Sequence, residues 1–115
     1  MTKTAVAAHF KGRAPLVREI YDRLIGAAEQ FGPVKQDPKK TSIHLARKTA
    51  FAGVAMRKDA VILTLKSASD IRSPRIIRRE QASANRWHLE VKLTDPKQVD
   101  KQIATWLGRA IDISQ

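Results

Sequence analysis

The run of residues 43–66 reads IHLARKTAFAGVAMRKDAVILTLK and decides the fold. At both of its ends apolar residues alternate with polar or small ones, and a period of two is typical of a β-strand with one buried face. The middle of the run is apolar or small throughout and suits a further strand. Short polar links after Lys48 and at Lys58–Asp59 indicate that the strands pair as hairpins. We expect strands at residues 42–46, 50–56 and 61–66.

Two further segments extend this sheet. Residues 87–93 alternate in the same way, with the apolar side chains of Trp87 and its alternate neighbours on one face. A brief strand at residues 34–36 would lie at an edge, because Pro38 cannot donate a backbone hydrogen bond. The stretch 67–86 shows no such period, and we expect a loop with a short helical turn there.

Helical signals flank the sheet. Pro15 suits the first position of a helix, apolar residues then recur every three or four positions, and Gly32 ends the run. A second helix is predicted to begin after Asp95, with Pro96 at its first position and Gln98 three residues after the cap, a capping-box pattern. The two apolar stripes are Val17, Ile20, Tyr21, Leu24, Ala27, Ala28 and Phe31, and Val99, Ile103, Trp106, Leu107, Ala110 and Ile111.

These elements predict an α+β fold. A helix, an antiparallel sheet and a closing helix form a two-layer sandwich when both helices bury their apolar stripes on the same sheet face. We therefore expect an antiparallel sheet of four to five strands, with the N-terminal and C-terminal helices packed on one face and the other face open. Residues 1–13 show no clear period and are predicted to form an N-terminal arm, and residues 14–115 a single domain.

The composition indicates a cytoplasmic protein with an anionic partner. The 115 residues include no cysteine, which excludes a disulfide framework and fits a reducing compartment. No apolar run reaches the roughly 20 residues that cross a bilayer, and the chain begins with no secretory signal, so we expect no membrane partner. The 22 basic and 11 acidic residues give a net charge of +11. Fourteen of the basic and five of the acidic residues lie within residues 34–93, so the middle of the chain holds most of the excess.

Several stretches resemble one family. Residues 38–47 (PKKTSIHLAR) and 49–54 (TAFAGV) are similar to the central strands of the bacterial and archaeal domain of unknown function numbered 5655. The stretch WHLEVKL at 87–93 resembles the late strand of that family with its histidine, and residues 99–110 resemble its closing helix. The resemblance covers about residues 14–111. It implies no particular activity, since none is assigned to the family.

The basic middle of the chain predicts binding of a nucleic acid or another polyanion. Lysine and arginine suit phosphate oxygens, and each neutralised phosphate adds affinity through counterion release. RNA and DNA both stay open. Phe51, Trp87 and Trp106 fit core positions better than a base-stacking platform, so recognition would be of backbone or shape. The alternative is ordinary solvated surface charge. The candidate residues are Lys39, Lys40, Arg47, Lys48, Arg72, Arg75, Arg78, Arg79 and Arg86.

A pocket for a small anion is the second candidate. If the strands that carry His44 and His88 are neighbours, the two side chains meet on the open sheet face above a floor of small residues with a cationic rim. The residues of this pocket would be Lys40, His44, Phe51 and His88. The alternative is two unrelated surface histidines.

Catalysis has weaker support. His88, Glu90 and Lys92 share one face of the predicted strand, and a carboxylate-x-lysine pair occurs in a class of Mg²⁺-dependent nucleases. The only acid nearby upstream is Asp70, and a solvated strand face explains the same spacing. The sequence therefore favours a binding protein over an enzyme and predicts no cofactor and no metal site. An interaction domain for an acidic protein partner is the third alternative, and no pattern indicates an oligomeric state.

Overall fold

The computed structural model describes residues 2–114, and its centre is a sheet of six antiparallel strands flanked by helices at both ends of the chain. The expected α+β class is confirmed, whereas the expected number of strands was too low. The elements are α1 (Thr2–Ala8), α2 (Pro15–Glu29), β1 (Lys35–Pro38), β2 (Ile43–Ala46), β3 (Ala50–Met56), β4 (Val61–Ser67), β5 (Ile76–Ser83), β6 (Arg86–Leu93), the 3₁₀ helix η1 (Pro96–Gln98) and α3 (Lys101–Ile113).

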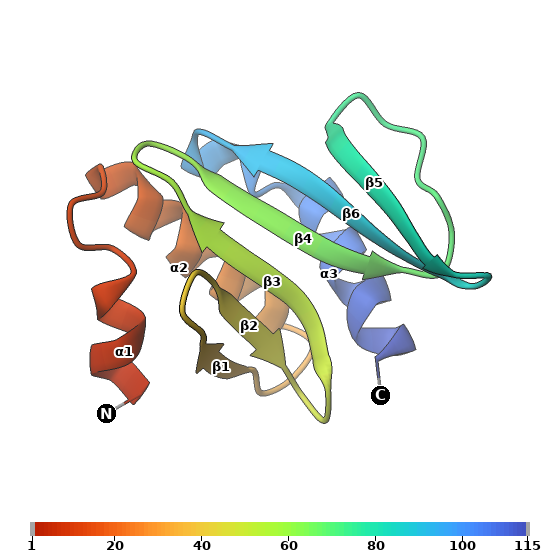
Figure 1. The fold of residues 1–115 in the computed structure, drawn as a ribbon, viewed down its shortest axis with the longest axis horizontal. Coiled ribbons are helices and arrows are strands. Elements are labelled where there is room, and N and C mark those ends of the chain that lie inside the picture. The colour runs from red at the N-terminus through yellow and green to blue at the C-terminus, as the bar shows by residue number, and fades with distance from the viewer. Residues whose placement is uncertain (1, 115) are drawn as a thin grey trace.

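The strands follow the order β1-β2-β3-β4-β6-β5 across the sheet. Helices α2 and α3 lie behind the sheet in Figure 1, and the face toward the viewer carries no helix over its central strands. The alternating apolar side chains of β2, β3, β4 and β6 point toward the helices and form the core, which is the ordinary arrangement of an antiparallel sheet with one solvated face. None of the helices between residues 2 and 114 is long and apolar enough to cross a membrane.

The prediction of a loop over residues 67–86 was wrong for its second half. Strand β5 pairs with β6 and forms one edge of the sheet. Only Ile76 of its eight residues is buried. Because this edge strand extends beyond the helices and is solvated on both faces, its sequence carries no alternation of apolar and polar residues. The opposite edge is β1, so the strand expected at residues 34–36 is at an edge as predicted, but it runs from Lys35 to Pro38.

The segment 1–13, which was predicted to form an N-terminal arm, contains helix α1. This helix packs against β1 and buries Val6, which is 6% exposed. A helix of seven residues presents too few apolar positions to show a helical period, so the pattern along the sequence could not reveal it.

Helices α2 and α3 bury most of the expected stripes on the sheet, but Phe31 follows α2 and is 44% exposed, and Val99 precedes α3 and is half-buried. The hydroxyl of Tyr21, on α2, donates a hydrogen bond of 2.6 Å to the side-chain oxygen of Gln36, and burial raises the pKa of Tyr21 above its ordinary value. The capping box of Asp95 and Gln98 is present, but it caps the short helix η1 and not α3. The chain then begins α3 separately at Asp100, whose carboxylate accepts from the Ile103 amide at 3.2 Å, so the predicted second helix is two elements.

A β-bulge between β2 and β3 sets which side chains reach the open face. Leu45 pairs with Ala52 and Ala46 pairs with Ala50, so Phe51 is the extra residue. Phe51 and Ala52 both turn into the core, with exposures of 0% and 6%. The residues of β3 that face the open side next to the bulge are therefore small, so the middle of that face is recessed.

Candidate anion-binding site

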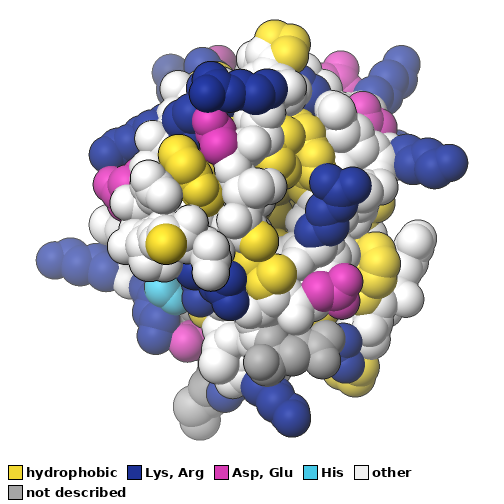
Figure 2. All heavy atoms as spheres, turned by 90° about the vertical axis from the view of Figure 1, so that its right-hand side faces the viewer, with side chains coloured by type: hydrophobic (Ala, Val, Ile, Leu, Met, Phe, Trp, Pro, Cys, Tyr) yellow, Lys and Arg dark blue, Asp and Glu magenta, His cyan; other side chains and the backbone are white. Residues whose placement is uncertain are grey.

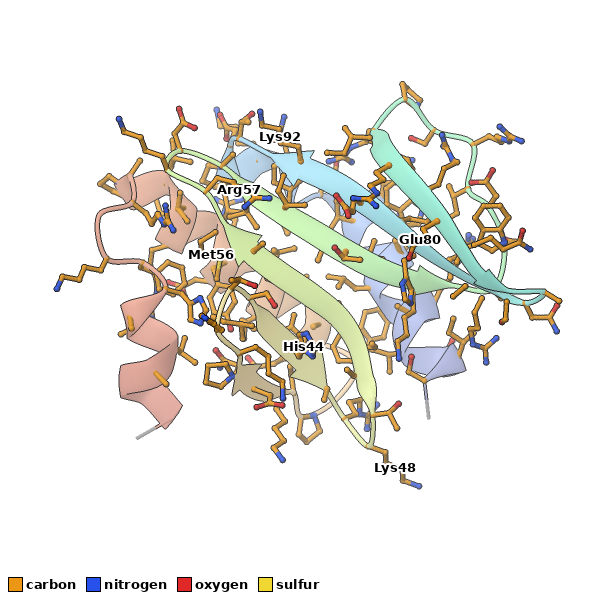
Figure 3. All side chains as sticks on the ribbon, in the orientation of Figure 1. His44, Lys48, Met56, Arg57, Glu80 and Lys92 are labelled. Carbon is orange, nitrogen blue, oxygen red and sulfur yellow. The ribbon has the colours of Figure 1, made fainter. Side chains whose placement is uncertain are left out.

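Strand pairing brings two histidines and a lysine onto the same part of the open sheet face. His44 on β2 lies opposite Gly53 on β3, and Gly53 lies opposite Thr64 on β4. Lys66, two residues after Thr64, lies opposite His88 on β6. Figure 3 labels His44 on β2, with its side chain drawn in front of the ribbon. The pocket hypothesis assumed that the strands of the two histidines are neighbours, and this was wrong, because β3 and β4 lie between β2 and β6. Both histidines nevertheless border one region of the open face.

This region forms a hollow, which we call the sheet hollow. Its volume is about 250 Å³. The floor is formed by alanine and glycine from β3, and at Gly53 the nearest side-chain atom to an added Cβ would be a ring carbon of His44 at 3.8 Å. Polar side chains stand around that floor. The lining residues are Ser42, His44, Ala50, Ala52, Gly53, Ala55, Thr64, Lys66 and His88.

The lining of the sheet hollow is cationic and hydroxylic. Among the described residues that line it there is no aspartate or glutamate. Two carboxylates stand beside the lining: Glu90 on β6 lies opposite Thr64, and Oε1 of Glu80 on β5 lies 3.9 Å from Nδ1 of His88. Glu80 also lies 3.8 Å from Arg78, which supplies a positive charge on its other side. The side chains that line the hollow therefore offer a ligand hydrogen-bond donors and the positive charge of Lys66.

Only two of the four residues predicted for the pocket line the sheet hollow. His44 and His88 line it, whereas Phe51 is fully buried because of the bulge and Lys40 lies in the β1–β2 turn outside the lining. Lys66 and Thr64 were missed as pocket residues. The alternation of β4 contained the signal, because Lys66 is on the polar side of that strand, but only the pairing of β4 with β6 places it beside His88.

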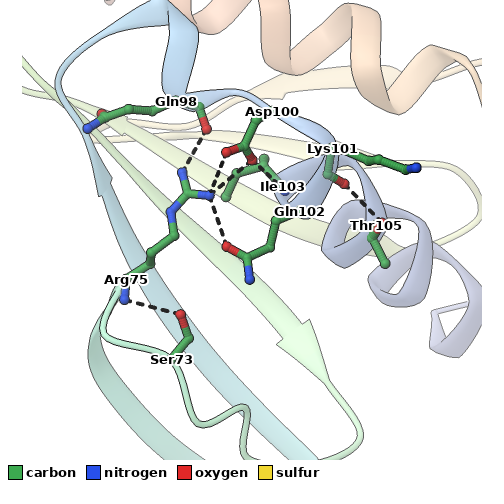
Figure 4. Close-up of polar contacts among 8 residues, drawn as sticks. All are labelled: Ser73, Arg75, Gln98, Asp100, Lys101, Gln102, Ile103 and Thr105. Carbon is green, nitrogen blue, oxygen red and sulfur yellow. Dashed lines mark hydrogen bonds and ion pairs between the residues drawn. The ribbon is translucent and has the colours of Figure 1, made fainter.

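Arg75 is held in a network rather than exposed to a partner (Figure 4). Its Nη1 donates to both carboxylate oxygens of Asp100 at 3.0 and 3.1 Å and to Gln102 at 3.1 Å, and its Nη2 donates to the carbonyl oxygen of Gln98 at 2.7 Å. The guanidinium also lies 6.0 Å from the centre of the Trp106 ring. Arg75 therefore fastens the loop before β5 to the start of α3.

The same network lowers the pKa of Asp100. Burial by itself acts in the opposite direction and raises this pKa, but the hydrogen bonds from Arg75 and from the Ile103 amide, together with the charge of Arg75, outweigh it. The carboxylate is thus held in its charged form at the beginning of α3, where negative charge also suits the helix dipole.

Three other candidate polyanion residues near β5 also have acidic partners. Arg79 Nε lies 2.7 Å from Asp70, Arg72 Nε lies 3.4 Å from the same carboxylate, and Arg78 pairs with Glu80. Figure 2, which views this side of the molecule, shows lysine and arginine side chains scattered around the margin with acidic side chains between them. The basic middle of the sequence is therefore not one basic surface in this region.

The remaining candidate polyanion residues lie in turns at the two ends of β2 and at the start of β6. Lys39 pairs with Asp37 at 2.8 Å, and Lys40 is exposed beside it. Arg47 donates to the carbonyl oxygen of Phe31 at 2.9 Å, and Lys48 stands at the tip of the β2–β3 turn, as Figure 3 shows. Arg86 begins β6 and contacts the end of α3.

The carboxylate-x-lysine pair is not joined by a second acid. Glu90 lies opposite Thr64 and Arg78, while Lys92 lies opposite Ile62. Asp70, the acid that a nuclease site would need, is instead paired with arginines. Within residues 2–114 no group of three or more histidine and acidic side chains is placed to hold a metal ion.

Comparison with known proteins gives one match, to a family. No curated protein and no solved structure matches the chain. A family model does match, over residues 6–114, which include every strand of the sheet and helices α2 and α3. The chain therefore belongs to the family described as "Domain of unknown function (DUF5655)".

Proposed function

We propose that the open sheet face binds a small anionic ligand in the sheet hollow. One observation carries this proposal: His44, Lys66 and His88 converge from three strands over a floor of small residues, and no carboxylate lines the hollow among the described residues.

The lining suits an anion chemically. The ammonium group of Lys66 supplies a positive charge, the two imidazoles supply ring N–H donors, and Ser42 and Thr64 supply hydroxyls. Hydrogen bonds from a charged donor to an anion are roughly twice as strong as neutral ones. The alanine and glycine floor lets an apolar part of the ligand lie against the sheet without displacing a side chain. Phosphate, sulfate and carboxylate groups all fit this description.

The test is a titration of the ¹⁵N-labelled protein with inorganic phosphate, sulfate and acetate, followed by amide chemical shifts. We expect shifts at Gly53, Thr64 and His88, and about tenfold weaker binding in Lys66→Gln, which removes one charge-assisted contact. The matched control is Lys92→Gln, because Lys92 is also a lysine on the open face but lies outside the hollow. Equal loss in the two variants, or shifts confined to other regions, would overturn the proposal.

Polyanion binding is the second candidate, and one observation favours it. Lys48, Lys66 and Arg86 come to the same end of the sheet, where β3 begins, β4 ends and β6 begins. With Arg47 they offer four cations to a phosphate backbone. Four neutralised phosphates would weaken binding roughly a hundredfold between 50 and 200 mM salt, whereas one small anion responds far less.

Fluorescence anisotropy separates the two candidates. Labelled single-stranded RNA, single-stranded DNA and duplex DNA are titrated at both salt concentrations. The polyanion candidate is supported if binding falls strongly with rising salt and is weakened by Lys48→Gln and Arg86→Gln. It is rejected if no nucleic acid binds at low salt. If the chain binds a protein and none of these nucleic acids competes for the site, the partner would instead be an acidic protein.

A further inference from the structure

A second hollow adjoins the sheet hollow at the end of the sheet, and we call it the end hollow. It lies between the β2–β3 turn, the β5–β6 hairpin and the end of α3, and its volume is about 340 Å³. Lys66 and His88 line both hollows. Lys66 and His88 lie directly opposite each other on β4 and β6, so this pair of side chains separates the two hollows. The lining residues are Thr49, Lys66, Ala82, Ser83, Arg86, His88, Ile113 and Ser114.

The end hollow has the donor set of an oxyanion site. Arg86 is fixed in place, since its Nη1 donates to the carbonyl oxygen of Asn85 at 2.7 Å and its Nη2 to that of Ile113 at 3.3 Å. Lys66 and His88 add two more cationic or N–H donors. Among its described lining residues there is again no carboxylate. Three such groups around one space match the charge and the several oxygens of a phosphate group.

A buried hydroxyl provides an independent indication. Ser114 is 9% exposed, and its Oγ has no hydrogen-bond partner within residues 2–114. Leaving a buried hydroxyl unpaired is costly, so such groups in native proteins call for an explanation. The hydroxyl of Thr49 is already used, since it donates to the carbonyl oxygen of Ser114. Ser114 is a lining residue of the end hollow, so this unpaired hydroxyl lies in the wall of that hollow.

The two hollows differ in the chemistry they offer. The sheet hollow has a floor of small, largely apolar residues, whereas the end hollow has Arg86 and hydroxyls and only Ala82 and Ile113 as apolar members. A ligand that used both would be elongated, with a strongly anionic group at one end and a compact organic part at the other.

We propose that the ligand is an organic phosphate monoester whose phosphate lies in the end hollow, between Lys66, Arg86 and His88, and whose organic part lies on the floor of the sheet hollow. This inference rests on the proposed small-anion function and specifies its ligand class. Inorganic phosphate offers the same charged group without the organic part, so it binds more weakly than the monoester.

The test compares inorganic phosphate, propyl phosphate and butyrate by calorimetry and by amide shifts of the labelled protein. Propyl phosphate is expected to bind at least tenfold more tightly than either of the other two, with shifts at Ser83 and Arg86 as well as at Gly53 and Thr64. Butyrate binding as tightly as propyl phosphate would overturn the choice of a phosphate. Inorganic phosphate binding as tightly as propyl phosphate would overturn the role of the organic part.

A charge placed in the end hollow tests the site itself. Ser83→Asp adds a carboxylate to the lining directly opposite Arg86, where it competes with a bound phosphate, so it should weaken propyl phosphate more than tenfold. Ala84→Asp is the control, because it adds the same charge to the same hairpin outside the lining. If Ser83→Asp has no effect while Lys66→Gln still weakens binding, the end hollow is excluded and the sheet hollow survives. If none of the three ligands binds, the proposed function fails with it.

Discussion

The basic side chains of this protein fall into two groups that the sequence alone makes look alike. In the segment 72–79 the arginines have carboxylate partners, namely Asp70, Glu80 and Asp100. Lys66 and Arg86 line hollows in which no carboxylate is present among the described residues. The comparison teaches that a local excess of arginine need not be a binding surface, because nearby acids and, for Arg75, an acid 25 residues away can neutralise it. The cations that are available to a ligand are fewer and lie elsewhere.

Removing Arg75 should produce the largest loss of stability. Arg75→Ala breaks four hydrogen bonds and leaves Gln98 and Asp100 without their partner, so we expect the free energy of unfolding to fall by about 2 kcal/mol. Anion affinity should stay unchanged. Urea unfolding checks the first expectation and phosphate titration the second.

Arg72→Ala is the control for Arg75→Ala. The Arg72 side chain is 85% exposed, and an exposed ion pair contributes at most about 1 kcal/mol. Equal stability of the two variants would contradict the structural role of Arg75.

Removing an acidic partner should make paired arginines available to a ligand, as Lys66 and Arg86 already are. Asp70→Asn removes the acidic partner of Arg79 and Arg72, and because Asp70 is 14% exposed we expect a loss of about 1 kcal/mol of stability. If the chain binds polyanions, affinity for RNA or DNA should rise more than in Asp59→Asn, which changes the net charge equally in an exposed turn. An equal rise in the two variants would show that only net charge matters.

Ser114→Ala should separate stability from binding. Because the buried hydroxyl has no partner among the described residues, its removal should raise the free energy of unfolding by about 1 kcal/mol. The same change should weaken binding of propyl phosphate. Thermal unfolding of Ser114→Ala beside Ser83→Ala, whose side chain is exposed, measures the stability effect. A destabilised Ser114→Ala protein would mean that the hydroxyl is satisfied in the fold.

The smallest expected effect is a loss of folding stability at low pH, through protonation of Asp100 in the network of Arg75. Because the pKa of Asp100 is lowered in the folded chain, its contribution is complete above the ordinary value of 3.8 and is lost as the pH falls through the folded value. Asp100 is 49% exposed, so after solvent screening the loss should be only about 0.5 kcal/mol. Unfolding measured from pH 6 to pH 2 should show a smaller acid dependence in Arg75→Ala. An identical dependence would remove Asp100 from the explanation.

Much of the fold followed from local patterns. Strands β2, β3, β4 and β6 and helices α2 and α3 each bury one face on the core, and burying one face imposes a period of two or of about 3.6 on the sequence. Strand β5 and helix α1 lack this imprint, since one is solvated on both faces and the other is very short. The shared face of His44 and His88 was predicted, because alternation determines the side of a sheet on which a residue lies.

The sequence by itself determined the α+β class, the family, the covered and open faces of the sheet, and the net charge of +11. Tertiary structure alone decided that Phe51 turns away from the hollow, that Lys66 stands beside His88, and that Arg75 is fastened to α3. The physical reason is the range of the interactions involved. Periodicity and capping act between neighbours in the chain, whereas a bulge, a strand register and an ion pair between residues 75 and 100 depend on which segments meet in space.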